Sequence, residues 1–201
     1  MINWFLKAKH WHLFILMIGI PMIAQIAIFM LMMLDAYNGS SSMSEGGKLF
    51  MIIFPIILLL FAFFHFGWFY SISFGLQKYI PEGVKMKVKK FKIFFWIPMG
   101  YIVLISLLIG VSFLGIQFDD NTGEASLSVI FSAMAFIIPL HLFSMFCIFY
   151  TLYFTAKTYK TALLQREVSF GDFAGEFFLF WFYFIGIWII QPKINKMVLD
   201  S

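Results

Sequence analysis

The stretch that decides the fold runs from Leu49 to Phe74 and reads LFMIIFPIILLLFAFFHFGWFYSISF. It contains no Asp, Glu, Lys or Arg, and it exceeds the roughly 20 mainly apolar residues that a helix needs to cross a bilayer. Backbone groups in lipid must be hydrogen-bonded within the spanning segment, and the stretch lacks the alternation of a barrel strand. It therefore predicts a transmembrane helix.

The rest of the chain has the same character. Its 201 residues are 62% hydrophobic, 21% aromatic and only 12% charged, whereas soluble domains are about 45–50% apolar and about 25% charged. Three further segments are long enough to span, and another is shorter; in order they cover 13–34, 93–117, 127–154 and 173–191. We therefore expect an all-α integral membrane protein with about five transmembrane helices in one membrane domain over 1–201.

The last segment is the least regular of these. Ser169 and Asp172 form the pattern of a helix-capping box just before it, and Pro192 is expected to end its helix. The favoured interpretation is a short interfacial turn that leads into a true fifth span. The alternative is a segment that lies in the interface or re-enters the membrane.

Positive charge is concentrated in alternate loops, and the loop after the fourth segment holds Lys157, Lys160 and Arg166. The loop after the second segment carries the densest cluster, Lys85, Lys87, Lys89, Lys90 and Lys92, while the loops on the other side carry Asp35, Glu45, Asp119, Asp120 and Glu124. Short loops rich in Lys and Arg stay in the cytoplasm, so we expect a multi-pass inner-membrane protein with a cytoplasmic N-terminus. The lysines form a membrane-surface basic loop that contacts lipid. The loop is too short for a nucleic-acid-binding domain, and no nucleic acid is expected as a partner.

An aromatic stripe with helical spacing in the second segment returns eighty positions later in the fourth. The matched residues are Phe66 with Phe146, Phe69 with Phe149, Tyr70 with Tyr150, Phe74 with Phe154, and Tyr79 with Tyr159. Ile20-Pro21-Met22 and Ile97-Pro98-Met99 also match. These matches predict two parallel hairpin repeats, 1–79 and 80–160, followed by a C-terminal helix and tail over 168–201.

The repeat also predicts how these aromatic side chains are used. The two stripes are expected to pack the second and fourth segments together, and the alternative is an aromatic ligand pocket between them. Tyr79 and Tyr159 lie just past the predicted spans, where tyrosines commonly anchor a helix at the membrane interface.

Polar side chains inside the predicted spans are few, and they are functional candidates because a polar group in hydrocarbon is costly. They are Gln25, His65 and His141. Histidine titrates near neutral pH and can bind metals, but no third ligand accompanies this pair, and one hydrogen bond between helices explains each equally well. We take the three as binding or pathway residues and expect no metal and no cofactor.

The remaining motifs exclude more than they assign. The chain has no nucleophile-elbow, phosphate-loop or zinc-protease motif, and its one cysteine, Cys147, is expected to be a small buried hydrophobe. The main expectation is a non-enzymatic membrane subunit that binds a membrane protein partner or further copies of itself. A small transporter or channel using the intramembrane His and Gln is the alternative. A membrane-embedded enzyme is third, and would require Ser106 or Ser112 to meet His141.

The string from Phe177 to Lys196, FFLFWFYFIGIWIIQPKINK, resembles the closing segment of a family of small bacterial polytopic inner-membrane proteins of uncharacterised function. The resemblance covers about a tenth of the chain. It implies a bacterial inner-membrane setting and supplies no activity.

Overall fold

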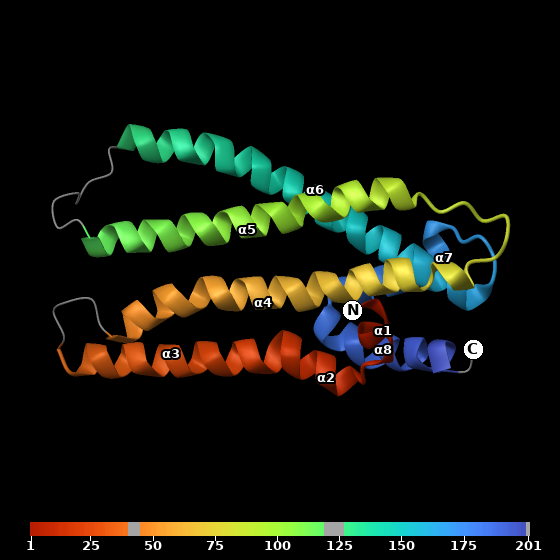
Figure 1. Ribbon diagram of the computed structural model, residues 1–201, viewed down its shortest axis with the longest axis horizontal. Helices are drawn as coiled ribbons and strands as arrows, with labels where there is room; N and C mark the ends of the chain where they lie inside the picture. The colour runs from red at the N-terminus through yellow and green to blue at the C-terminus, as the bar shows by residue number, and fades with distance from the viewer. Residues whose placement is uncertain (40–44, 119–126, 200–201) are drawn as a thin grey trace.

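The computed structural model describes residues 1–39, 45–118 and 127–199 (Figure 1). These residues are helical almost throughout, and no strand occurs among them. Four helical stretches are long and apolar enough to cross a membrane, and they are His10–Tyr37, Gly46–Tyr79, Val88–Gly110 and Met134–Leu164. The all-α class is therefore confirmed, and the four stretches overlap the first four predicted segments. The acidic residues Asp119, Asp120 and Glu124 lie outside the described residues.

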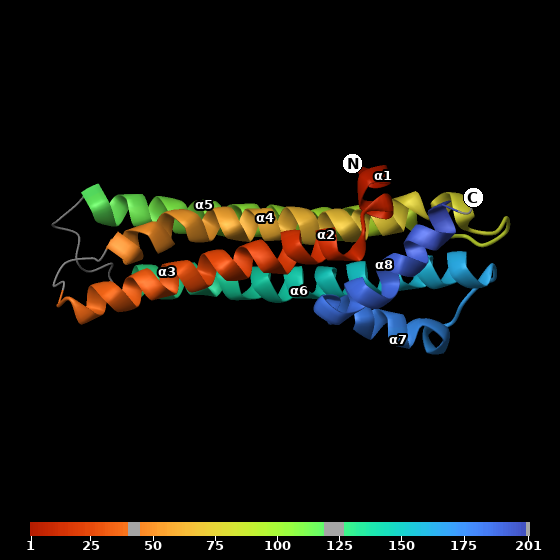
Figure 2. The ribbon, with the colours of Figure 1, turned by 90° about the horizontal axis from the view of Figure 1, so that it is seen from below.

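The elements follow one another as α1 (Ile2–Lys7), α2 (His10–Phe14), a π-helical turn (Ile15–Gly19), α3 (Ile20–Tyr37), α4 (Glu45–Gly75), a 3-10 turn (Gln77–Tyr79), α5 (Val88–Phe118), α6 (Leu127–Leu164), α7 (Phe170–Trp181) and α8 (Tyr183–Leu199). The long helices α3 to α6 run along the long axis of the molecule, and α1, α7 and α8 gather in one half of it (Figures 1 and 2). The loops after α4 and α6 lie at the end of this half (Figure 1). We call the end that carries these loops the basic end, because the α4–α5 loop contains the lysine cluster. The half of the molecule that contains this end is the basic half.

Helix α6 is longer than a membrane requires. Its 38 residues extend about 57 Å at about 1.5 Å per residue, whereas the hydrocarbon core is about 30 Å thick. Toward the basic end its buried face becomes polar, with Thr151, Thr155, Thr158 and Thr161 all buried. The hydroxyls of Ser73 on α4 and Thr155 on α6 are 2.9 Å apart and join the two helices.

Rings of the α4 and α6 aromatic stripes share one buried cluster with rings of α5. The ring of Phe95 on α5 contacts Phe66 and Tyr70 on α4, with centroids 5.8 and 5.2 Å apart. One turn earlier on α5, Phe91 stacks on Phe154 of α6 at 4.6 Å. Helices α4 and α6 also pack directly on each other. The predicted packing of the second and fourth segments is therefore present, and α5 adds rings that the prediction left out.

Tyr159 is not an interfacial anchor. Its side chain is 1% exposed and packs edge-on to Phe180 of α7, with ring centroids 6.2 Å apart. Helix α7 covers this face of α6, which the pattern of charges in the sequence could not indicate. Cys147 is buried, as expected.

The predicted fifth segment is not one helix. The backbone leaves helical geometry at Phe182, whose φ is −86° and ψ is 58°, and the chain turns from α7 directly into α8. The 12 residues of α7 and the 17 of α8 correspond to about 18 and 26 Å, and the two lie against the basic half of the bundle (Figure 2). Pro192 lies inside α8 and does not end it. The capping box of Ser169 and Asp172 is present.

Two amides on α8 hold the first helix of the chain in place. Gln191 is fully buried; its Oε1 accepts a hydrogen bond from Trp68 Nε1 at 2.8 Å, and its Nε2 donates to the carbonyls of Phe5 and Ala8, both at 2.9 Å. Asn195, one turn later, donates to the carbonyl of Leu6 at 2.8 Å. The last carbonyls of a helix have no partner within it, and here α8 supplies partners to those of α1.

Replacing Gln191 by leucine is expected to lower the free energy of unfolding by about 3 kcal/mol, because the Trp68 N–H and the α1 carbonyls lose a buried partner. Gln25→Leu is the matched control, since Gln25 is half-buried in an apolar groove and α1 does not depend on it. The apparent melting temperature in detergent measures both. Equal melting temperatures for the two variants would contradict the role given to Gln191.

The turn between α7 and α8 needs a glycine at position 186. A Cβ atom there would lie 1.9 Å from the carbonyl oxygen of Leu179, so Gly186→Ala is expected to separate the two helices and to destabilise the protein by about 1–3 kcal/mol. Gly175→Ala on α7 meets nothing within 4 Å and should leave the melting temperature unchanged or raise it. A Gly186→Ala variant as stable as Gly175→Ala would show that α7 and α8 are packed less closely.

Candidate functional site

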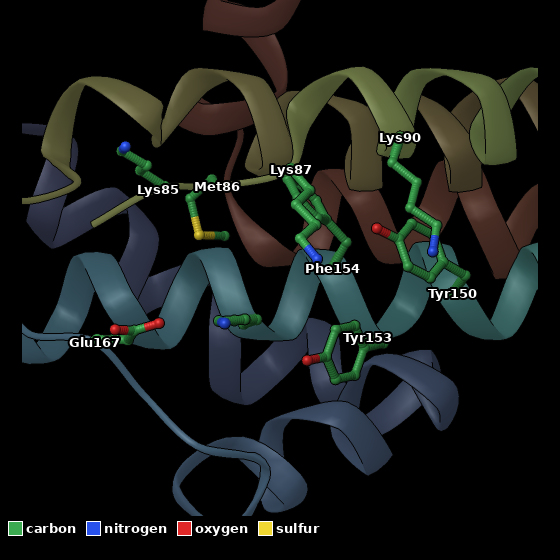
Figure 3. A pocket seen from close by; sticks show the side chains of 9 residues that line it. Lys85, Met86, Lys87, Lys90, Tyr150, Tyr153, Phe154 and Glu167 are labelled. Atoms are coloured by element: carbon green, nitrogen blue, oxygen red, sulfur yellow. The ribbon is translucent and has the colours of Figure 1, made fainter. Parts of the chain in front are cut away.

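A pocket of about 380 Å³ opens at the basic end between α5 and α6. Figure 3 shows its lining, which comes from the α4–α5 loop and the start of α5 on one side and from α6 and the loop after it on the other. The lining residues are Lys85, Met86, Lys87, Lys90, Tyr150, Tyr153, Phe154, Lys157 and Glu167. Basic side chains and aromatic rings thus surround one hollow.

The aromatic wall positions the lysine of α5. The Lys90 ammonium lies 5.1 Å from the centre of the Tyr150 ring and 5.4 Å from that of Phe94 (Figure 3). A cation within about 6 Å of an aromatic face is attracted to it. Tyr150, Tyr153 and Lys157 follow spacings of three and four residues, which places them on one face of α6.

The charges in the pocket are unbalanced. Four ammonium groups, from Lys85, Lys87, Lys90 and Lys157, share the lining with one carboxylate, that of Glu167. A hollow lined by one sign of charge concentrates ions of the opposite sign. The arrangement is therefore suited to hold an anion, and the tyrosine hydroxyls can add hydrogen bonds to it.

The structure divides the predicted basic loop. Lys85, Lys87 and Lys90 line the pocket, whereas Lys89 and Lys92 do not. The Lys92 ammonium instead lies 5.3 Å from the ring centre of Phe74 on α4. From the sequence, Lys157 is expected in the loop after the fourth segment, apart from the lysine cluster. Its helical spacing from Tyr150 and Tyr153 was the signal that could have indicated a shared face.

His65 lies in the middle of an aromatic contact network. Its ring stacks on Phe61 at 5.1 Å and meets the edges of Phe69 and Tyr183 at 4.5 and 4.6 Å. Its Nδ1 atom is buried and has no hydrogen-bond partner among the described residues. The side chain lines a second cavity, between α4, α6 and the α7–α8 turn.

His141 has a different environment. Its Nδ1 atom is 3.0 Å from the hydroxyl of Tyr101 on α5, which is the single hydrogen bond between helices that the alternative interpretation expected. The hydroxyl of the buried Ser106 has no hydrogen-bond partner in the described part of the chain, so it does not pair with this histidine. The side chain of Ser112 lies outside the described residues.

Gln25 lines an open apolar groove between α3 and α4, together with Pro21 and Phe61 among others. None of the described contacts joins Gln25, His65 and His141 to one another. Within residues 1–39, 45–118 and 127–199, no cluster of three or more His, Cys, Asp or Glu side chains could hold a metal ion.

Comparison with protein-family models, with curated proteins and with solved structures gives no match to this chain. The arrangement of the side chains therefore carries the functional argument alone.

An exposed ion pair fixes the loop that brings Glu167 to the pocket. Arg166 Nη2 donates to Asp172 Oδ1 at 2.7 Å, and the backbone N–H of Ser169 donates to Asp172 Oδ2 at 2.8 Å. The hydrogen bond from Arg166 and those from Ser169 hold the pKa of the Asp172 carboxyl well below its usual range.

This pKa shift predicts a pH dependence. A carboxyl whose pKa is depressed by folding stabilises the protein above its unfolded pKa, about 3.9, and the contribution is lost as the pH falls from there toward the folded pKa. Asp172→Asn should therefore lower the melting temperature at pH 7, and the difference from the natural protein should shrink below about pH 4. In a variant that already carries Arg166→Gln, Asp172→Asn should lower the melting temperature by less than it does in the natural protein. A difference that is constant with pH would contradict the assignment.

Proposed function

We propose that this chain is a non-enzymatic, multi-pass membrane protein that binds the phosphate-bearing headgroup of an anionic lipid in the pocket between α5 and α6. The observation that carries the proposal is the set of four lysines around one hollow beside two tyrosines. Basic pockets between membrane helices are a known means of holding anionic headgroups on the cytoplasmic side.

The position of the pocket supports a lipid as its occupant. The lining residues lie in the first turn of α5 and the loop before it, and in the part of α6 near the basic end and the loop after it. At these places each helix passes from apolar to charged sequence. A headgroup held there leaves its acyl chains beside the exposed apolar side chains of the bundle, such as Ile93 and Trp96. A free anion would not use that surface.

The same pocket supports a direction in the membrane. Short loops rich in lysine stay on the cytoplasmic side, so the basic end with both termini is proposed to be cytoplasmic, and the inner membrane of a bacterium is the proposed location. Transport along a path lined by Gln25, His65 and His141 has less support. The Gln25 groove and the His65 cavity adjoin at Tyr183, but His141 lines neither and bonds to Tyr101 instead.

Native mass spectrometry of the protein in detergent, with cardiolipin, phosphatidylglycerol or phosphatidylcholine added, tests the proposal. The anionic lipids should be retained and phosphatidylcholine should not. Each lysine near an anionic surface contributes about 1 kcal/mol, so replacing Lys85, Lys87, Lys90 and Lys157 together by glutamine should weaken retention on the order of 1,000-fold.

The matched control replaces Lys7, Lys9, Lys193 and Lys196 by glutamine, which removes the same charge from exposed positions that do not line the pocket. Equal losses of lipid retention in the two quadruple variants would show that only net charge matters, and would overturn the pocket as the binding site. If inorganic phosphate bound as tightly as the lipid, the proposal that the ligand is a lipid headgroup would be overturned. The same spectra test the subunit hypothesis, which expects a second protein or a second copy in stoichiometric amount.

A further inference from the structure

The cavity beside His65 lies apart from the basic pocket and has a different chemistry. Its volume is about 230 Å³, less than the roughly 300–1,000 Å³ of sites that enclose a drug-sized molecule. It is lined by His65, Met145, Ile148, Phe149, Leu152, Phe180, Trp181 and Tyr183. It is therefore sized for one ring and not for a whole lipid, and no residue is shared with the basic pocket.

The walls of the cavity favour a flat apolar ring. Four of the lining side chains are aromatic, and Trp181 meets Phe149 edge-on with ring centroids 4.6 Å apart. Aromatic rings pack well against other rings in offset or edge-on arrangements. The thioether of Met145 adapts to ring edges in the same way.

Among the described residues that line the cavity, only His65 has a buried side-chain nitrogen or oxygen without a hydrogen-bond partner. Its Nδ1 atom is buried without a partner among the described residues, and an unpaired buried polar atom costs about 1–3 kcal/mol. In a neutral imidazole one nitrogen donates and the other accepts. Such a ring can bind a carbonyl or a hydroxyl equally well.

No Lys, Arg, Asp or Glu lines the cavity, so a charged ligand would lose its hydration without compensation. The occupant is therefore uncharged. The rim is accessible from lipid, since Trp181 and Met145 are 44% and 40% exposed and both line the cavity beside α6 and α7. A ring inside could thus carry an apolar tail that extends into the bilayer.

The geometry points to a second binding site at His65, for the head ring of a lipid-soluble quinone or quinol. The ring lies among the aromatic side chains, one carbonyl or hydroxyl oxygen bonds to the imidazole, and the tail leaves past Trp181. This site is independent of the headgroup pocket at the basic end, and either can exist without the other.

Titration of the purified protein in detergent with a short-tailed ubiquinone and a short-tailed menaquinone tests this site. Quinones quench tryptophan fluorescence at short range, so a saturable loss of the fluorescence of the six tryptophans reports binding. Trp181 lines the cavity and Trp68 packs on Phe180 of its lining, so Trp181→Phe should remove most of the saturable part. His65→Leu should weaken binding about tenfold through loss of one hydrogen bond.

His141→Leu is the matched control, since this histidine lies on α6, bonds to Tyr101 of α5 and does not line the cavity. Met145→Phe is a second variant that fills the cavity from its exposed rim without touching His65, and it should abolish binding. Each variant is first checked for a native elution volume and helical circular dichroism. Absence of saturable quenching in the natural protein, or equal affinities of His65→Leu and His141→Leu, would overturn the site.

Discussion

The basic half of the molecule depends on the hydrogen bonds of one buried amide. Gln191 joins three parts of the chain, because it accepts from an indole on α4 and donates to carbonyls at the end of α1. A helix of only six residues such as α1 is far shorter than the roughly 12–15 residues at which an isolated helix becomes even marginally stable in water. Its position is determined by tertiary contacts, and α8 supplies the polar ones.

Around this amide, α1, α7 and α8 form an aromatic and aliphatic core with the parts of α4 and α6 that lie in the basic half. The smaller core of α4, α5 and α6 lies beside it and is made largely of phenylalanine rings. Both candidate sites lie at the borders of these cores. The basic pocket is bounded by Phe154 of the smaller core, and the His65 cavity by Phe180 of the larger one.

The features that could be predicted from the sequence are those set by the surroundings of each segment. Long apolar runs are compatible with lipid and clustered lysines with water, and these two patterns predicted the four long helices and the basic loop. The α7–α8 turn could not be predicted in this way, because Phe182 ends α7 within a run as apolar as a true span. The duplication remains a prediction, since two hairpins are present but their equivalence rests on the sequence matches. Lys157 was assigned to another loop because a contact between α5 and α6 is not visible in a one-dimensional pattern.

The bond between Gln191 and the carbonyl of Phe5 joins positions 186 residues apart in the chain. Chains are made from the N-terminus at about 5–20 residues per second, so α1 emerges well before α8. In that interval α1 can pack on α4 through Phe5 and Leu6, but its last carbonyls lack the amide donors of α8. The polar part of this contact can therefore form only after α8 has left the ribosome, and a chain that stops before Gln191 leaves those carbonyls of α1 without these partners.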